Sequence, residues 1–508
     1  MASTTQGSTD DTASASFETT TGPVRIITSA SLFDGHDAAI NVFRRLMQEC
    51  GAEVIHLGHD RSAWDIANAA IQEDAHAIAI TSYQGGHDLY FPYVRQLLDE
   101  AGYSHVRIFG GGGGTILPHE VETLHENGIS KIYTPEDGRK MGLVGMVKDL
   151  MATSSEVDLI SSERLDVLNN SVNASETGSV ALLLTVAENS DEETFRETME
   201  KCRTKSADEK VPIIGLTGTG GAGKSSLIDE TMLRITRDNP DAKVALLCTD
   251  PTRKRTGGAL LGDRLRMNCL SNPNIFMRSF ASRGSGNELA ACTARAIEAC
   301  QAVGFDLIVV ETSGIGQGAD AVTEICDVSL YVTTNEYGAA SQLEKIEMLD
   351  AADLIVLNKF EKLGAEDALT AIRKQVRRNR NEFSIDDALL PVVPTIASQF
   401  ADPGVDDLWN RLSTILNERH STSFASTAPE LGKDGLPKRS ATIPSDRTNY
   451  LGEISATVRN YHKRTKEIAD KVRNVRQLMS SAEYLESRPE DKGKSAADLR
   501  KEAEEIKS

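Results

Sequence analysis

The 508-residue sequence contains no apolar run near the roughly 18 residues that a membrane-spanning helix needs. Its seven cysteines are scattered without Cys-x-x-Cys or Cys-x-His spacing, so neither a disulfide framework nor a zinc site is predicted. Aspartate and glutamate outnumber lysine and arginine, which gives a formal net charge of −20. This charge argues against binding to duplex nucleic acid or to anionic membranes through bulk electrostatics. We therefore expect a cytoplasmic protein with reduced thiols.

The first 22 residues also lack the features of a targeting segment. They are polar and rich in Ser and Thr, without the apolar core of a signal peptide or the arginines of a transit peptide. This composition predicts a disordered tail. The remaining chain is too long for one hydrophobic core and predicts several domains.

Two regions alternate short apolar runs with segments of helical length, which predicts α/β domains with parallel sheets. The first region, residues 23–152, is expected to form a Rossmann-like (flavodoxin-like) domain. The second, residues 209–420, begins with the run "VPIIGLTG" and contains five more such runs. Residues 153–208 are predicted to be a helical connector, and residues 421–508 a linker with a helical segment. Ligands of such sheets bind at the carboxyl ends of the strands.

The stretch "GTGGAGKSS" (218–226) matches the phosphate-binding pattern G-x-x-x-x-G-K-[ST] between a predicted strand and a predicted helix. Backbone N–H groups would face the phosphates, the lysine would reach the β- and γ-oxygens, and the following serine would bind Mg²⁺. The predicted phosphate-binding residues are Gly220, Gly221, Ala222, Gly223, Lys224, Ser225 and Ser226. The alternative is a glycine-rich turn that binds nothing.

Three later strand ends complete a predicted nucleotide site. Asp250 and Glu311 are candidate Mg²⁺-side carboxylates, with Glu311 alternatively positioning the attacking water, and the Gly314 N–H could meet a γ-phosphate. In "LIVLNKFEK", a carboxylate would accept hydrogen bonds from the N1–H and exocyclic amine of guanine, which favours GTP over ATP. The predicted base-binding residues are Asn358, Lys359 and Glu361.

These segments resemble the metallochaperone class of P-loop GTPases. "DPTRKRTGGALLGDRLRM" and "ETSGIGQ" are similar to its switch segments. The resemblance implies that Asp250 and Asp263 lie on the Mg²⁺ side and that Arg264 responds to the nucleotide. Lys224 and Glu311 are the residues we expect to act in catalysis. The acid that reads the base in this class is usually Asp, whereas this sequence has Glu361.

In the first region, His36 follows a predicted strand and lies two residues after Asp34. An imidazole at such a turn can bind a transition metal, and a neighbouring carboxylate can orient it. The turns "TSYQGGH" and "FGGGGG" at two later strand ends carry small residues, which let a bulky ligand approach the backbone. The pattern G-x-G-x-x-G is absent from the first turn. The alternative is an ordinary surface histidine.

This arrangement resembles the cobalamin-binding domain of adenosylcobalamin-dependent mutases, whose pattern is D-x-H-x-x-G, then S-x-L, then G-G. The sequence departs from it at Ala39 and Gln84. The resemblance implies that His36 is the lower axial ligand of cobalt and that the displaced nucleotide tail enters a slot in the domain. The matching cofactor residues are Asp34, His36, Ser82, Gly110 and Gly111.

A cobalamin domain followed by this GTPase resembles the fused isobutyryl-CoA mutases. That family implies adenosylcobalamin, Mg²⁺ and GTP, and radical interconversion of isobutyryl-CoA and n-butyryl-CoA, with GTP hydrolysis gating cofactor loading or repair. It also implies an acyl-CoA-binding (β/α)₈ barrel of about 250 residues, expected as a partner domain or subunit, and a homodimer. Two alternatives remain: a stand-alone GTPase chaperone that delivers cobalamin to a separate mutase, and a corrinoid-sensing regulator timed by GTP.

Overall fold

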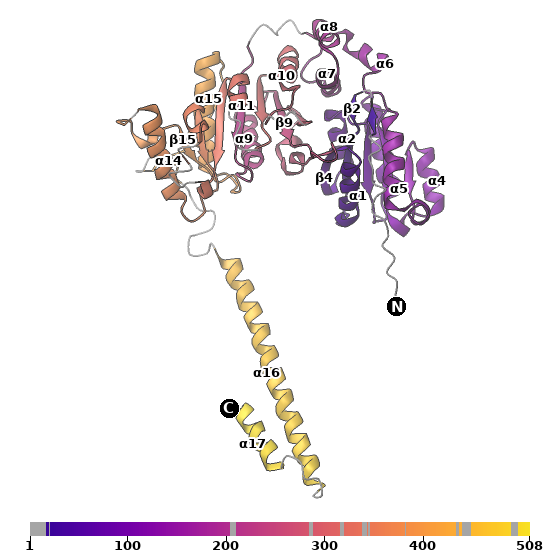
Figure 1. Cartoon of the computed structure of the whole chain (residues 1–508), viewed down its shortest axis with the longest axis vertical. Coiled ribbons are helices and arrows are strands. Elements are labelled where there is room, and N and C mark those ends of the chain that lie inside the picture. The colour runs from indigo at the N-terminus through magenta and orange to yellow at the C-terminus, as the bar shows by residue number, and fades with distance from the viewer. Residues whose placement is uncertain are drawn as a thin grey trace, which may run out of the picture. The chain divides into compact units, whose positions relative to one another are not determined.

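The computed structural model describes residues 17–19, 21–203, 210–283, 288–314, 320–337, 343, 346–381, 383–432, 436–438, 449–488 and 496–507. The chain forms two compact units, Met1–Lys438 and Arg439–Ser508. The first unit contains two parallel sheets with helices on both faces, which confirms the predicted α/β class (Figure 1).

The first sheet belongs to the N-terminal domain, and all its neighbouring strands are parallel. In spatial order its strands are β10 (Ala259–Leu261), β4 (Glu53–Arg61), β3 (Arg25–Ser31), β5 (Ala77–Thr81), β6 (Arg107–Gly111) and β7 (Lys131–Tyr133). Its helices are α1 (Asp37–Glu49), α2 (Ala63–Gln72), α3 (His87–Glu100), α4 (Pro118–Glu126) and α5 (Pro135–Ser155). The short strands β1 (Glu18–Thr19) and β2 (Gly22–Pro23) pair at the end of the predicted tail.

Apolar residues on both faces of this sheet explain why helices cover it twice. Ile26, Val54 and Phe109 pack under α1 and α5, whereas Ile27 and Ile78 pack under α2 and α3. The carboxyl ends of β3, β5 and β6 therefore emerge together at one edge, where the predicted cofactor residues lie.

The second sheet belongs to the P-loop domain, and its strands are also parallel. Its order is β11 (Ile275–Ala281), β9 (Val244–Asp250), β12 (Leu307–Glu311), β8 (Ile213–Gly218), β13 (Val328–Thr333), β14 (Leu354–Leu357) and β15 (Val392–Pro394). Its helices include α9 (Lys224–Asp238), α10 (Thr293–Ala302), α11 (Asp320–Ile325), α13 (Met348–Ala351), α14 (Ala365–Arg380) and α15 (Pro403–His420). The phosphate-binding motif follows β8, the central strand.

Residues 153–203 form the helices α6 (Ser162–Leu165), α7 (Thr177–Asn189) and α8 (Glu192–Cys202), with a 3-10 turn between α6 and α7. Helix α7 is part of the hydrophobic core, because its residues from Val180 to Ala187 are all buried. It packs against α2 of the N-terminal domain and against α10 of the P-loop domain. The apolar run "VALLLTVA" thus ties the two domains together.

One strand of the N-terminal sheet comes from the P-loop domain's part of the sequence. Strand β10 pairs with β4 in parallel, with Ala259 opposite Glu53 and Leu261 opposite Ile55. The sequence predicted a switch loop here, with no strand. A three-residue strand next to glycines leaves no periodic pattern, and its partner lies about 200 residues earlier in the chain.

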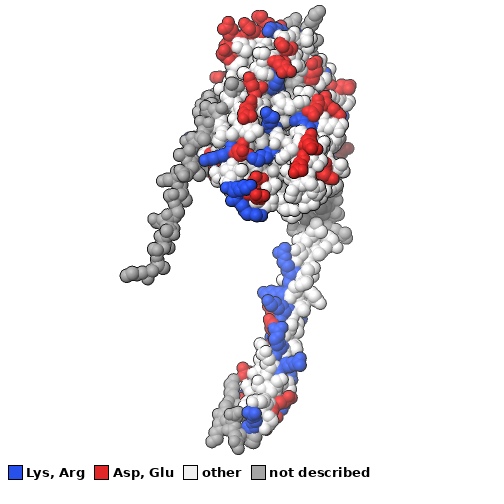
Figure 2. Space-filling view, turned by 90° about the vertical axis from the view of Figure 1, so that its right-hand side faces the viewer, with Lys and Arg blue, Asp and Glu red and all other residues white. Residues whose placement is uncertain are grey.

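The second compact unit consists of α16 (Tyr450–Glu486) and α17 (Ala496–Lys507), which pack together around Ala482 and Ala503. Two apolar side chains of α16, Ile468 and Val472, are exposed within this unit. Lys and Arg side chains gather along one side of α16 (Figure 2). Among the described residues, none of the helices is long and apolar enough to span a bilayer.

Candidate cofactor and nucleotide sites

The loop after β3 holds His36 against Asp34. The imidazole Nδ1 lies 2.8 Å from Asp34 Oδ1, and the His36 backbone N–H donates to the same oxygen at 2.9 Å. The Tyr83 backbone N–H, from the loop after β5, donates to Asp34 Oδ2 at 2.6 Å. Both carboxylate oxygens are thus occupied, and Nε2 is the ring nitrogen left to bind a metal.

Electrostatics favour an ionised Asp34 beside this histidine. Burial opposes ionisation, but the N–H groups of Tyr83 and His36 and the imidazole outweigh it and hold the pKa of Asp34 below its usual value. The carboxylate is fully buried, whereas the His36 side chain is 74 % exposed. A buried carboxylate that orients an exposed imidazole is the arrangement typical of a metal-binding histidine.

A cavity of about 280 Å³ opens beside this loop, near the small end of ligand pockets. Its lining includes Gly110 and Gly111, whereas Ser82 is not among the lining residues. The Ser82 hydroxyl instead accepts a hydrogen bond from Ser31 at 2.9 Å. Gly112 is required next to it, since a Cβ there would lie 1.9 Å from the Ser82 carbonyl oxygen.

The cavity fits a ligand that is mostly apolar but carries some polar groups. The walls contain Phe109, Tyr133 and Met146, and the buried Thr81 hydroxyl has no hydrogen-bond partner among the described residues. An orphaned hydroxyl in a lined slot is a place for a ligand group. The sequence pattern did not identify these residues, because nothing in strand or helix periodicity shows which side chains face a cavity.

In the P-loop domain, β8 ends at Gly218 and α9 begins at Lys224, with the loop of residues 219–223 between them. The Lys224 ammonium donates to the Gly218 carbonyl at 3.3 Å, across the loop that would hold the phosphates. It also lies close to Gly314, where a Cβ would be 2.2 Å from Nζ. Lys224 and Gly314 are thus brought together as predicted from the sequence.

The predicted Mg²⁺ residues Ser225 and Glu311 also meet. The Ser225 hydroxyl donates to Glu311 Oε1 at 3.0 Å. Asp250 lies at the carboxyl end of β9. The backbone of Asp263 begins the 3-10 turn η3 (Asp263–Arg266), but its side chain is not among those that the structure describes. Among the described residues, no group of three or more His, Cys, Asp or Glu side chains lies close enough together to hold a metal ion. A hydroxyl from the first turn of α9 and a carboxylate from the end of β12 nevertheless suit Mg²⁺.

Arg264 contacts the N-terminal domain in this structure. Its guanidinium is buried and donates to Glu73 Oε1 at 3.0 Å, to the Met277 carbonyl at 3.3 Å and to Gln72. Glu73 and Gln72 belong to the N-terminal domain, a partner that the sequence does not reveal. The nucleotide-responsive role of Arg264 was implied by the resemblance to a switch segment and stays a prediction.

The predicted base-reading segment contacts the phosphate-binding loop. The Asn358 amide donates to the Ala222 carbonyl at 2.9 Å, and its oxygen accepts from the Thr395 hydroxyl and the Ala397 N–H, each at 3.1 Å. Lys359 donates to the Gly221 carbonyl at 2.7 Å. Glu361 is exposed. Residues 315–317 of the predicted switch "ETSGIGQ" lie outside the described residues.

Two known protein families match separate parts of the chain. Residues 24–136 match the B12 binding domain, and residues 180–429 match the methylmalonyl Co-A mutase-associated GTPase MeaB. A fused isobutyryl-CoA mutase of Geobacillus kaustophilus is 46% identical over 474 residues, which cover 92% of this chain and 43% of that protein. The chain is a homologue of the N-terminal half of the fused isobutyryl-CoA mutases, with a B12 binding domain and a MeaB-type GTPase domain.

A second fused isobutyryl-CoA mutase, from Nocardia farcinica, is 46% identical over 457 residues, covering 90% of this chain and 42% of that protein. The chain thus spans less than half the length of the fused mutases that it matches. It contains their cobalamin-binding and GTPase portions.

Proposed function

We propose that this chain binds adenosylcobalamin in its N-terminal domain and hydrolyses GTP with Mg²⁺ in its P-loop domain. In this proposal the two activities serve a mutase that interconverts isobutyryl-CoA and n-butyryl-CoA, with GTP hydrolysis gating cofactor loading or repair. The observation that carries it is the Asp34–His36 pair beside a glycine-walled cavity, in a chain that also holds a P-loop.

His36 would supply Nε2 to cobalt, with Asp34 fixing the ring through Nδ1. The cavity lined by Gly110 and Gly111 would receive the nucleotide tail, and the Thr81 hydroxyl would meet one of its polar atoms. Adenosylcobalamin, when bound, supplies a cobalt–carbon bond whose homolysis gives a radical. The residues of this chain hold the cofactor and orient its lower face.

In the P-loop domain, backbone N–H groups of Gly220 to Ser226 would hold the phosphates, and Lys224 would neutralise charge on the γ-phosphoryl group. Ser225, Glu311, Asp250 and Asp263 are proposed on the Mg²⁺ side, and Gly314 at the γ-phosphate. Mg²⁺, when bound, supplies further neutralisation of the phosphates. Glu311 would lose its hydrogen bond from Ser225 when that hydroxyl turns to the metal.

We further propose that the acyl-CoA substrate is held by a (β/α)₈ barrel, as another domain or subunit, in a homodimeric cytoplasmic assembly. The second candidate is a GTPase chaperone that loads a separate mutase without joining its active site. The two differ in one measurable property. A stable one-to-one complex with a barrel protein during turnover supports the first, and transient association supports the second.

We expect cob(II)alamin bound to ¹⁵N-labelled protein to show hyperfine coupling to a protein nitrogen in its electron spin resonance spectrum. His36→Ala should remove that coupling. His59→Ala is the matched control, because His59 Nδ1 also lies 2.8 Å from an aspartate, Asp60, but at the end of β4. A spectrum that retains coupling to the cofactor's own benzimidazole nitrogen would exclude His36 as the ligand.

Because Glu361 is exposed, substitutions there should leave the fold intact and test whether this residue selects guanine over adenine. We expect GTP to be hydrolysed in strong preference to ATP, and Glu361→Asp to retain or sharpen the preference because the shorter acid is usual in this class. Glu361→Gln should relax the preference, since an amide also presents a donor to the base. Competition of the two nucleotides measured in one reaction gives the ratio directly, and equal kcat/KM values in the unaltered chain would contradict the assignment.

A further inference from the structure

The segment 251–267, named here the crossing segment, begins in one domain and is bonded into the other. It follows Asp250, the last residue of β9 and a proposed Mg²⁺ carboxylate. Its strand β10 then joins the N-terminal sheet, and the Ala259 N–H donates to the Ala52 carbonyl at 3.1 Å. One short stretch of backbone therefore connects the end of β9 in the P-loop domain with the start of β4 in the N-terminal domain.

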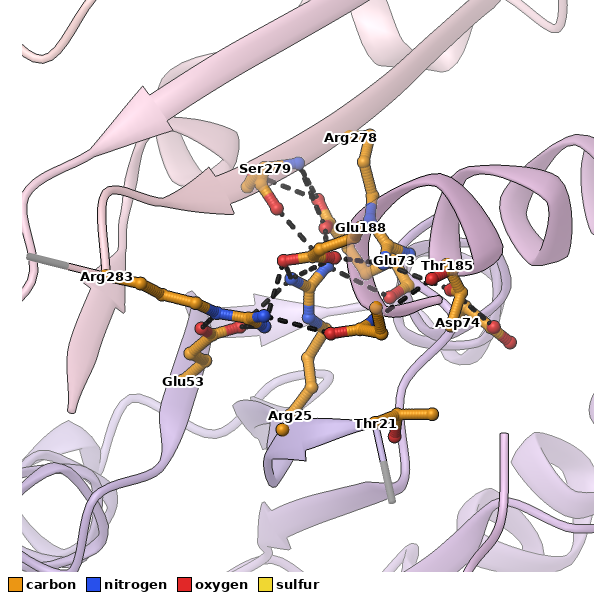
Figure 3. A network of polar contacts seen from close by, with 12 residues as sticks. Thr21, Arg25, Glu53, Glu73, Asp74, Thr185, Glu188, Arg278, Ser279 and Arg283 are labelled. Carbon is orange, nitrogen blue, oxygen red and sulfur yellow. Dashed lines mark hydrogen bonds and ion pairs between the residues drawn. The ribbon is translucent and has the colours of Figure 1, made fainter. Parts of the chain in front are cut away.

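A second connection starts from the same aspartate. The Ser282 N–H donates to the Asp250 carbonyl at 2.9 Å, and the Arg283 N–H donates to the Thr252 hydroxyl at 2.7 Å. The Arg283 guanidinium reaches across the domain boundary to Glu53 Oε1 at 2.7 Å (Figure 3). Glu53 is also the residue opposite Ala259, so both connections meet at the start of β4.

The crossing segment also contacts the edge of the N-terminal sheet that carries the proposed cofactor site. The Leu265 side chain lies against Gly58, where a Cβ would be 2.6 Å from Leu265 Cδ1. Arg61 donates to the Leu265 carbonyl at 3.3 Å. Gly58 and Arg61 belong to the carboxyl end of β4, next to β3, whose following loop contains His36.

Docking of the crossing segment completes a buried polar contact but also leaves one group unpaired. Arg264 and Glu73 form a buried ion pair, and Glu73 also accepts from the Ser279 N–H at 3.1 Å. At another point of the crossing segment, the Gln48 backbone carbonyl faces Gly258, and the Gln48 side-chain amide is fully buried without a partner among the described residues. A buried ion pair favours the docked position and an orphaned amide opposes it, which suits a contact that is made and released.

We propose that the crossing segment couples the two sites, so that cobalamin bound to the N-terminal domain raises the affinity of the nucleotide site for Mg²⁺. This inference rests on the proposed function. A ligand that orders the carboxyl end of β4 stabilises the docked segment, and the docked segment holds the backbone of Asp250. Coupling is reciprocal, so Mg²⁺ with nucleotide raises the affinity for cobalamin by the same factor.

The test is a Mg²⁺ titration of the full chain with a fluorescent, slowly hydrolysed GTP analogue, with and without hydroxocobalamin. We expect the apparent Mg²⁺ affinity to rise about tenfold with hydroxocobalamin, a size typical of coupled sites. The cobalamin affinity, measured by absorbance, should rise equally when Mg²⁺ and the analogue are present. Neither readout is mutase activity.

Two glycines of the crossing segment give a matched pair of variants. A Cβ at Gly258 would lie 2.2 Å from the Gln48 carbonyl oxygen and 2.9 Å from that of Ala52, so Gly258→Ala should prevent docking. A Cβ at Gly262 would meet only Leu260 of the same segment, at 3.6 Å. We expect Gly258→Ala to reduce the coupling factor to near one and Gly262→Ala to leave it unchanged.

Leu265→Ala is a milder second variant, since Leu265 is 40 % exposed and the substitution removes its contact with Gly58. It should also lower the coupling factor. A folded Gly258→Ala or Leu265→Ala chain that retains the full factor overturns the proposal. Independent binding of both ligands by the unaltered chain overturns it too and leaves the proposed function standing. If the unaltered chain binds neither cobalamin nor the nucleotide with Mg²⁺, both the coupling and the proposed function are refuted.

Discussion

Lys224→Ala is expected to lower GTP turnover by about a hundredfold to a thousandfold, the loss typical when one group that stabilises transition-state charge is removed. The Lys224 ammonium donates a hydrogen bond to the Gly218 carbonyl across the phosphate-binding loop. It also lies beside Gly314, where a γ-phosphate would be held. Alanine removes the charge but keeps the start of α9. Steady-state release of phosphate under saturating Mg²⁺ and GTP measures the effect.

The control for this substitution is Lys210→Ala, because the Lys210 side chain is exposed and pairs only with Asp327 among its described partners. That variant should retain normal turnover. Cobalamin binding to Lys224→Ala in the absence of nucleotide should match the unaltered chain, which shows that the fold is intact. Turnover by Lys224→Ala at the normal rate would mean that the phosphates are held elsewhere.

Gly138→Phe is expected to weaken cobalamin binding by at least about thirtyfold, because the added ring would occupy a slot that can give roughly 2 kcal/mol or more of apolar burial to a ligand. Gly138 lines the cavity from α5, and a Cβ there meets only Met146 Cε at 3.8 Å. Gly138→Ala should therefore bind normally. Equilibrium titration followed by cobalamin absorbance distinguishes the two variants.

A corrinoid without the nucleotide tail sharpens this test. Cobinamide has no group to enter the cavity, so Gly138→Phe should bind it as well as the unaltered chain does. GTP turnover of the variant without cofactor should also be normal. Equal loss of cobalamin and cobinamide would show that the substitution damages the domain, and undiminished cobalamin binding would place the tail outside this cavity.

The residues predicted from the sequence come together where short-range rules apply. The P-loop pattern fixes a strand, a turn and a helix, so the meeting of Ser225 and Glu311 follows from one motif and one strand end. Asp34 and His36 are two residues apart, and their contact is local. Parallel strands also present their carboxyl ends at one edge, which brings Tyr83 to Asp34.

Features that depend on distant partners could not be predicted in this way. Arg264 pairs with Glu73 across 191 residues of sequence, and a basic loop looks the same whether its arginine meets a phosphate or a buried carboxylate. The cavity wall draws on β5, β6, β7, α1 and α5, so no single segment carries its signature. Helix α7 was predicted to be helical, but its position between the two domains follows from packing that its own sequence does not encode.

The sharing of β10 between the domains also has a consequence for synthesis of the protein on the ribosome. Strand β4 is translated about 200 residues before the strand that covers its outer edge. At ~5–20 residues per second, the nascent N-terminal domain would wait roughly 10 to 40 s with Val54 and Ile55 on an uncovered strand. Uncovered strands invite pairing with other chains. Slow elongation between residues 61 and 259 would therefore raise the demand for chaperones, and synonymous codon changes in that stretch should alter the soluble yield without altering the folded protein.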